Sequence, residues 1–304
     1  FPTRRSSDLN AVLSLIRLQN SLNKMKFNPK EHIDYRKKRL QQTNINNKKL
    51  LGLTAVEINP TELCNRTCSF CPRHDPLIYP NRNLNMSVDT AKLLCAQLLE
   101  ADYTGDINIT GFGEPLLNKD IVEICNLFSK HFHTEIITNG DNLINNKFLV
   151  TDFSSLALVI VDCYDGKSQI DKVTSLFNDT PVNYLIRNHY DAPEVDAQES
   201  YGFNNRGGSL YKAETMHKPC YLPAYKAFVD WNGDVRLCCN DWFRLQDSFG
   251  NITEREFSNI WMSDAFATVR KELAIGNRNK YKPCQNCDVA GTLVGEESVA
   301  LWTQ

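Results

Sequence analysis

The sequence predicts an α/β protein in which a parallel sheet with outer helices is followed by a smaller domain of another kind. Between residues 54 and 188, short β-rich runs alternate with amphipathic segments, and such units build parallel sheets that stay open or close into a barrel. Leu156–Val161 is almost continuously apolar, as expected for a strand buried on both faces. After about Tyr201 the alternation stops and a hairpin signal follows, which indicates the second domain.

The strands and helices of the first domain follow one another in a regular order. The predicted strands are Thr54–Asn59, Asp106–Thr110, Thr134–Thr138, Leu156–Val161 and Val182–Ile186. Helices are expected over residues 87–101, 119–130 and 165–177, and Ser87 is placed to cap the first of them.

The two ends of the chain are expected to differ from this core. Residues 1–9 resemble the translation of a common sequencing adapter and are left out of the fold prediction. Residues 10–50 are predicted to form one or two surface helices and a linker. In the C-terminal part, Lys226–Cys239 predicts two strands joined at Asn232-Gly233, followed by a helix over Glu254–Ile275 and a cysteine-bearing loop. The expected division is therefore 10–50, 51–215 and 216–304.

Composition narrows the class of protein. The chain has 34 Lys and Arg against 36 Asp and Glu, a net charge of -2, which gives no electrostatic attraction to nucleic acid or to an anionic membrane. No stretch approaches the roughly 20 apolar residues of a membrane span, and no secretory signal is evident, so a cytoplasmic location is expected. Eleven cysteines in that compartment indicate metal binding rather than disulfides.

The first cysteine group has the spacing C-x3-C-x2-C and directly follows the first predicted strand. It consists of Cys64, Cys68 and Cys71. Three thiolates on one short loop can ligate three irons of a [4Fe–4S] cluster and leave the fourth iron open to another ligand. A structural zinc site normally has four protein ligands, often in two pairs, and remains the alternative interpretation.

This spacing, with Phe70 just before the last cysteine, resembles the signature of radical S-adenosylmethionine (SAM) enzymes. Gly111, Gly113, Glu114 and Pro115 lie in Gly-Phe-Gly-Glu-Pro after the second strand and resemble the segment that receives the methionyl amino group of SAM in that family. Thr138 and Asn139 resemble the stretch near the ribose. The resemblance also implies cofactor contacts for Asp162 and Arg187 at the ends of the fourth and fifth strands, whereas plain turns and strand ends are the alternatives.

The second cysteine group is expected to bind its own cluster. Cys220, Cys238, Cys284 and Cys287 are arranged as C-x12-G-x4-C followed by C-x2-C, which resembles the twitch domain, a shortened SPASM domain with one auxiliary [4Fe–4S] cluster. Cys239 competes with Cys238 for this role, and alternation along a strand would allow only one of them to face the cluster. A zinc ribbon is the structural alternative.

The resemblance implies a partial (β/α)6 TIM-like barrel followed by a small β-hairpin-plus-helix twitch domain. It also implies an oxidoreductase that cleaves SAM reductively to a 5′-deoxyadenosyl radical, with electrons from a donor such as flavodoxin or ferredoxin. The radical would abstract a substrate hydrogen, and the auxiliary cluster would help to complete a two-electron oxidation of a sugar- or cyclitol-like molecule. A peptide-modifying enzyme and a zinc-stabilised binding module without catalysis are the alternatives.

Overall fold

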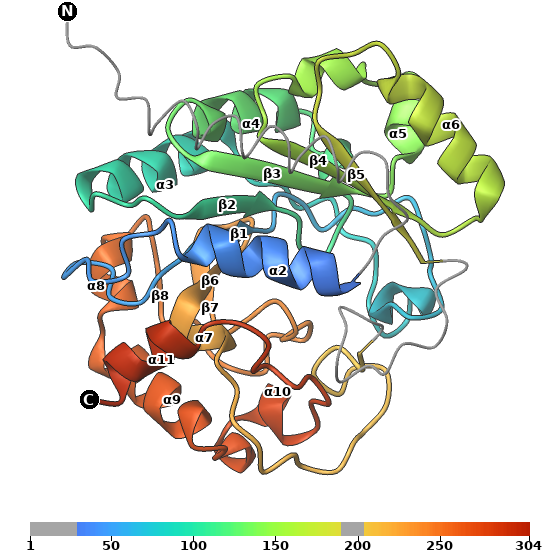
Figure 1. The fold of residues 1–304 in the computed structure, drawn as a ribbon. Coiled ribbons are helices and arrows are strands. Elements are labelled where there is room, and N and C mark those ends of the chain that lie inside the picture. The colour runs from blue at the N-terminus through green and yellow to red at the C-terminus, as the bar shows by residue number, and fades with distance from the viewer. Residues whose placement is uncertain (1–28, 190–203) are drawn as a thin grey trace, which may run out of the picture.

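The computed structural model describes residues 29–189 and 204–304 and confirms the α/β class (Figure 1). One sheet runs in the order β5-β4-β3-β2-β1-β6-β7-β8 and is not closed. Its strands from β5 to β6 are parallel, and β7 and β8 are added antiparallel. The strand bounds are β1 Ala55–Ile58, β2 Asp106–Ile109, β3 His133–Thr138, β4 Leu158–Cys163, β5 Tyr184–Asn188, β6 Lys226–Val229, β7 Asp234–Arg236 and β8 Gly250–Asn251.

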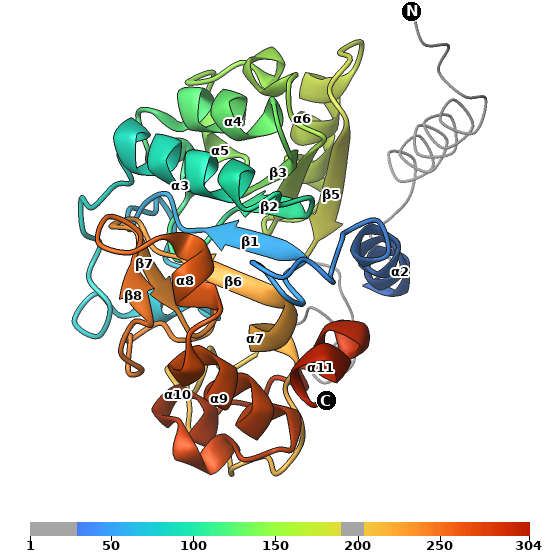
Figure 2. The same ribbon diagram turned by 90° about the vertical axis from the view of Figure 1, so that its left-hand side faces the viewer.

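Helices cover the outer face of the parallel strands, as the alternating pattern predicts (Figure 2). They are α3 Val88–Glu100, α4 Ile121–Ser129, α5 Asp141–Ile144 and α6 Lys167–Phe177, with short 3₁₀ turns η1 Pro72–His74, η2 Pro115–Leu117 and η3 Val150–Phe153. The Ser87 hydroxyl caps α3 by accepting the amide of Thr90 at 3.1 Å. Cys95 and Cys125 are buried in α3 and α4 as small apolar residues.

The sixth parallel strand comes from an unexpected part of the chain. Residues 51–215 contribute five strands, and β6 of the C-terminal region pairs with β1 in parallel, with Ala55 opposite Lys226. The sheet therefore continues across the boundary expected at residue 216. Sequence alternation cannot predict this pairing, because the hydrogen-bonding partner of an edge strand is a tertiary choice.

The C-terminal region differs in detail from its prediction. The hairpin forms at Gly233, which has φ 89°, but β7 ends at Arg236, so Cys238 and Cys239 lie in the following turn and not on a strand. The single helix expected over Glu254–Ile275 is two helices, α8 Phe257–Trp261 and α9 Asp264–Ala274, because Ser263 caps a new start. The remaining elements are α7 Leu222–Tyr225, η4 Arg278–Lys280, α10 Lys282–Gln285 and α11 Glu296–Trp302.

The N-terminal helix α2, Pro29–Leu40, is more buried than a surface helix. Tyr35 donates to Glu135 Oε1 at 2.6 Å, and Arg36 and Arg39 form ion pairs at 2.5 Å and 2.6 Å with Glu135 and Asp106. Asp106 opens β2 and Glu135 lies near the start of β3, so α2 closes the end of the sheet where the strands begin. Residues 10–28 of the expected helical segment, like residues 1–9, lie outside the described residues.

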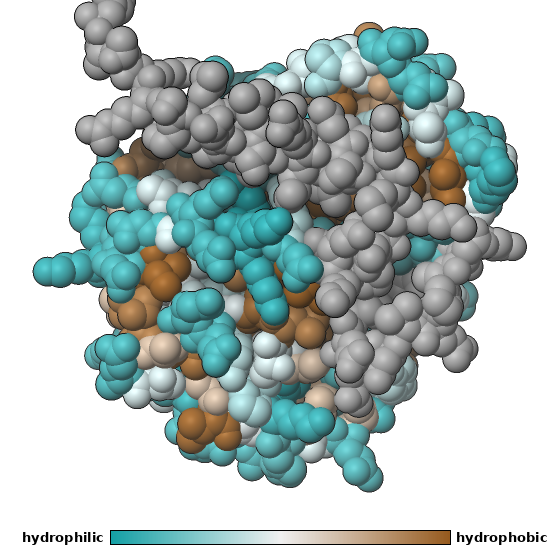
Figure 3. Space-filling model, in the orientation of Figure 1, coloured by the Kyte–Doolittle hydropathy of each residue, from teal (hydrophilic) through white to brown (hydrophobic). Residues whose placement is uncertain are grey.

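On the face seen in Figure 3, hydrophobic residues show in separate patches between hydrophilic ones. Among the described residues, no helix combines the length and the apolar character that a membrane crossing requires.

Candidate active site

The loop with Cys64, Cys68 and Cys71 lies just after β1, at the end of the sheet opposite α2. The amide group of Asn81 fixes its start by accepting the Cys64 N–H at 2.8 Å and donating to the Cys64 carbonyl at 3.0 Å. All three thiols are free and partly exposed. Burial raises the pKa of Cys64 to about 11 and also raises the pKa values of the other two. A metal must therefore displace their protons when it binds.

Glu114 and Thr138-Asn139, expected to contact the amino group and the ribose of SAM respectively, meet beside this loop. The Glu114 carboxylate accepts the Thr138 hydroxyl at 2.5 Å and the Asn139 N–H at 2.8 Å. The Glu114 N–H donates to the Leu63 carbonyl at 2.7 Å, one residue before Cys64. Burial raises the pKa of Glu114 to about 7.

Two glycines allow the segment before Glu114 to lie close to the residues that precede Cys64. A Cβ at Gly111, which has φ 119°, would lie 2.3 Å from Asn59 Oδ1, and one at Gly113 would lie 2.3 Å from the Thr61 carbonyl. Such distances are far below van der Waals contact, so only glycine allows this segment to lie against the start of the cysteine loop.

Asp162 and Arg187 are engaged with each other. Arg187 Nε and Nη2 donate to the two Asp162 oxygens at 2.5 and 2.6 Å, and His189 Nε2 lies 3.2 Å from the same carboxylate. Burial acts to raise the pKa of Asp162, but the charges and hydrogen bonds of Arg187 and His189 together hold the pKa below its usual range. Any cofactor contact of these residues would add to the ion pair. His189 also stacks on Tyr164, with ring centroids 5.2 Å apart, and Phe70 lies at the same distance on another side of Tyr164.

The four cysteines of the second group gather in the C-terminal region. Burial raises the pKa of Cys238, and the nearby thiols, including those of Cys284 and Cys287, raise it further. Burial is the main cause that raises the pKa values of Cys284 and Cys287, and the nearby Cys220 raises both further. A Cβ at Gly291 would lie 2.5 Å from Cys220 Sγ, so a glycine is needed for the backbone to pass this thiol.

Cys239 faces elsewhere. It lines a separate cavity, where burial raises its pKa and the charges of Glu57 and Lys226 have the next largest effects. The turn after β7 thus separates the two neighbours, although not by the strand alternation expected from the sequence.

The cavity that Cys239 lines has a volume of about 290 Å³ and extends from Phe70 to α2. Its wall carries the Glu57–Lys226 ion pair, with 2.5 Å between Oε2 and Nζ, from adjacent strands β1 and β6. Asn108 of β2 is 4% exposed, and its Nδ2 has no hydrogen-bond partner within the described part of the chain. These residues were not predicted from the sequence, although polar residues that alternate along buried strands were a usable signal.

Arg206, in the loop that enters the C-terminal region, also lines the cavity. Its φ is 52°, and its Nε is buried without a hydrogen-bond partner among the described residues. It lies near Cys71 of the first group and near Cys239, because its positive charge lowers the pKa values of both thiols against the larger effect of burial.

One further group has metal-ligating side chains, Asp106, His133 and Glu135. Its two carboxylates already pair with Arg39 and Arg36, so the positive charge a metal would supply is present in the protein. The two cysteine groups offer only sulfur ligands, which suit iron–sulfur clusters.

Comparisons with known proteins give consistent results. Residues 58–146 match the family model of the radical SAM superfamily, and residues 220–288 match that of the SPASM iron–sulfur cluster-binding domain. The S-adenosyl-L-methionine-dependent 2-deoxy-scyllo-inosamine dehydrogenase of Niallia circulans is 30% identical over 259 residues, covering 79% of this chain and 94% of the relative.

Solved structures are similar over the same extent. The crystal structure of BtrN in complex with AdoMet and 2-DOIA superposes with a TM-score of 0.68 and 26% identity, covering 80% of this chain and 96% of BtrN. BtrN in an open conformation gives a TM-score of 0.56 and 25% identity, covering 78% and 92%.

Proposed function

Since this chain belongs to the radical SAM superfamily and carries a SPASM domain, we propose that it dehydrogenates a small polyhydroxylated molecule of the sugar or cyclitol type. The observation that carries the proposal is the likeness, over most of both chains, to a dehydrogenase whose name specifies an aminocyclitol. The cavity that reaches Phe70 of the first cysteine loop supports it, because charged and polar side chains form part of its lining.

The two domains imply a [4Fe–4S] cluster that works with SAM and an auxiliary iron–sulfur cluster. We propose that Cys64, Cys68 and Cys71 hold the first, and that Cys220, Cys238, Cys284 and Cys287 hold the second. When bound, these groups supply hydrogen-atom abstraction from a carbon and acceptance of one electron. A flavodoxin or ferredoxin is the proposed source of the reducing electron.

Glu114 is the residue proposed to bind the amino group of SAM. As a buried carboxylate held by Thr138 and Asn139, it is suited to receive an ammonium group without moving. In this proposal Phe70, Gly111, Gly113, Pro115, Asp162 and Arg187 shape the surrounding surface.

Arg206 is suited to act on the substrate. Oxidation of a secondary alcohol to a ketone removes a hydrogen atom from carbon, a proton from the hydroxyl and one further electron. A guanidinium without an acidic partner among the described residues stabilises the negative charge left on the hydroxyl oxygen as the proton leaves. Asn108 Nδ2 and the Glu57–Lys226 pair offer hydrogen bonds to the other hydroxyl groups.

The test is anaerobic turnover with SAM, a low-potential reductant and a panel of 2-deoxy-scyllo-inosamine, other cyclitols and amino sugars. We expect equal amounts of 5′-deoxyadenosine and a product two mass units lighter, with deuterium transferred from the oxidised carbon. SAM cleavage with no oxidised member of the panel would contradict the substrate class, and oxidation of a co-supplied peptide instead would favour the peptide-modifying alternative. No 5′-deoxyadenosine from protein with about eight irons per chain would contradict the reaction type itself.

A further inference from the structure

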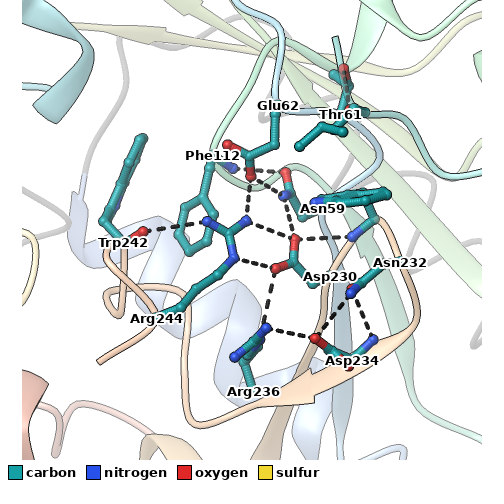
Figure 4. Close-up of polar contacts among 12 residues, drawn as sticks. Asn59, Thr61, Glu62, Phe112, Asp230, Asn232, Asp234, Arg236, Trp242 and Arg244 are labelled. Carbon is teal, nitrogen blue, oxygen red and sulfur yellow. Dashed lines mark hydrogen bonds and ion pairs between the residues drawn. The ribbon is translucent and has the colours of Figure 1, made fainter. Parts of the chain in front are cut away.

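A largely buried network of charged and polar side chains links residues next to the first cysteine loop with residues of the C-terminal region (Figure 4). Its centre is Arg244, which lies six residues after Cys238 in the C-terminal region. Arg244 Nη2 donates to Glu62 Oε1 at 2.5 Å, and its Nε donates to Asp230 Oδ2 at 2.6 Å. Arg244 is thus bound on one side to the start of the first cysteine loop and on the other to the hairpin of the SPASM region.

The Glu62 carboxylate accepts hydrogen bonds from residues on both sides of the first cysteine loop. Its side chain is 2% exposed and accepts Tyr79 Oη at 2.8 Å, Arg73 Nη2 at 3.2 Å and Asn59 Nδ2 at 3.1 Å, in addition to Arg244. Glu62 lies two residues before Cys64, and Arg73 lies two residues after Cys71. One carboxylate therefore ties both ends of the loop that bears the first three cysteines.

The same network reaches the glycine-rich segment. Asn59 Oδ1 accepts the Phe112 N–H at 2.9 Å, and Arg73 Nε donates to the Phe112 carbonyl at 2.8 Å. The guanidinium of Arg244 lies 5.1 Å from the centre of the Phe112 ring, which also packs against Trp242 at 4.6 Å. Phe112 is held from all these sides, two residues before Glu114.

The backbone of Arg244 is strained. Its φ of 51° lies in the left-handed region, where a residue with a side chain is held only by its surroundings. The turn before it is fixed as well, because the Asp241 carboxylate accepts the N–H groups of Leu245 and Gln246 at 2.8 and 3.0 Å. The Asp241 N–H in turn donates to the Cys238 carbonyl at 3.3 Å, which connects this turn to the second cysteine group.

We propose that Arg244 is a positioning residue for the first cluster and its SAM site. It fixes Glu62, and through Glu62 and Phe112 the cysteine loop and the glycine-rich segment, relative to the loop that follows Cys238. This inference rests on the proposed ligand assignment but not on the proposed substrate. It means that the C-terminal region, besides holding its own cluster, contributes to SAM binding through Glu62 and Phe112.

The test compares Arg244→Met with Arg236→Met in anaerobically reconstituted protein. Arg236 is the matched control, because it pairs with Asp234 and lies 3.8 Å from Asp230 but forms no hydrogen bond or ion pair with Glu62 in the described part of the chain. The readouts are the SAM-induced change in the electron paramagnetic resonance spectrum of the reduced cluster and the dissociation constant of SAM. We expect Arg244→Met to weaken SAM binding about tenfold or more and to reduce the spectral change, since small misplacements at such sites are costly. Arg236→Met should bind SAM as the wild type does.

A second variant distinguishes loss of this contact from unfolding of the Arg244→Met protein. Glu62→Gln keeps the size of the side chain and its hydrogen-bonding oxygen but removes the charge opposite Arg244. It should weaken SAM binding in the same direction, and the double variant should lose less than the product of the two single losses. Arg244→Lys should recover part of the affinity.

Three results would overturn the proposal: wild-type SAM affinity in Arg244→Met, multiplicative losses in the double variant, or equal loss of iron from both sites in Arg244→Met and Arg236→Met. Iron is assigned to each site in the background of Cys64→Ala/Cys68→Ala/Cys71→Ala, where about four irons should remain. An iron-free background would instead contradict the proposed ligand assignment, so the two failures are distinguishable.

Discussion

In the proposed SAM site, protonation of Glu114 should make SAM binding depend on pH in a predictable direction. Burial raises the pKa of this carboxyl to about 7, although the three groups that donate to it, the Thr138 hydroxyl and the N–H groups of Asn139 and Leu116, favour the charged form. Only the charged form pairs fully with an ammonium group. Affinity should therefore rise with pH between 6 and 8.

The size of the effect follows from the pKa. One unit below a pKa of about 7, roughly one molecule in eleven carries the charge, and one unit above it roughly ten in eleven do. The predicted gain from pH 6 to pH 8 is thus about tenfold, or about 1.4 kcal/mol. Glu114→Gln should bind SAM more weakly at pH 8 and lose this gain.

The assay is equilibrium binding of SAM to anaerobically reconstituted wild type and Glu114→Gln at pH 6, 7 and 8. The amino group of SAM titrates as well, but it does so equally with both proteins, so the ratio of their affinities isolates Glu114. A ratio that stays constant across this range would refute the reasoning.

Two further predictions use matched pairs of substitutions. Cys238→Ala should lower the iron content of the reconstituted chain toward about four irons, whereas Cys239→Ala should keep it near eight, because only Cys238 lies with the other thiols of its group. The measurement is iron analysis of both variants. Loss of iron in Cys239→Ala but not in Cys238→Ala would assign the ligand to Cys239 instead. Arg36→Met should lower the free energy of unfolding in urea by about 3 kcal/mol, since it removes the positive charge that pairs with the buried Glu135 carboxylate. Lys167→Met, which breaks an exposed ion pair, should change stability by less than about 0.5 kcal/mol.

Local patterns predicted much of this molecule. The strand and helix positions from 54 to 188 were close, because hydrophobic period and capping are properties of short segments, as at Ser87. The meeting of Glu114 with Thr138 and Asn139 was also predictable, since the carboxyl ends of neighbouring parallel strands lie at one edge of a sheet.

Tertiary pairings were not predictable in the same way. Asp162 and Arg187 were each expected to contact a cofactor, but nothing in the sequence shows that neighbouring strands place them opposite each other in register. The ion pair between Arg244 and Glu62 joins residues 182 positions apart, and such pairs leave no periodic signal. Helix α2 was predicted as a surface element because its basic residues resemble a solvated face, whereas their partners are carboxylates inside the sheet.

Strand β1 connects the two parts of the chain that bear the cysteine groups. It lies between β2 and β6, so its two edges bond to the core and to the C-terminal region respectively. It leads directly into Asn59 and Glu62, which bond to Asp230 and Arg244 of that region. A chain cut at residue 215 would expose an edge of β1 and leave Glu62 without one of its two arginine partners. The division at residue 216 therefore follows the sequence pattern, whereas the hydrogen bonds of Asn59 and Glu62 connect the residues before the first cysteine loop to the C-terminal region.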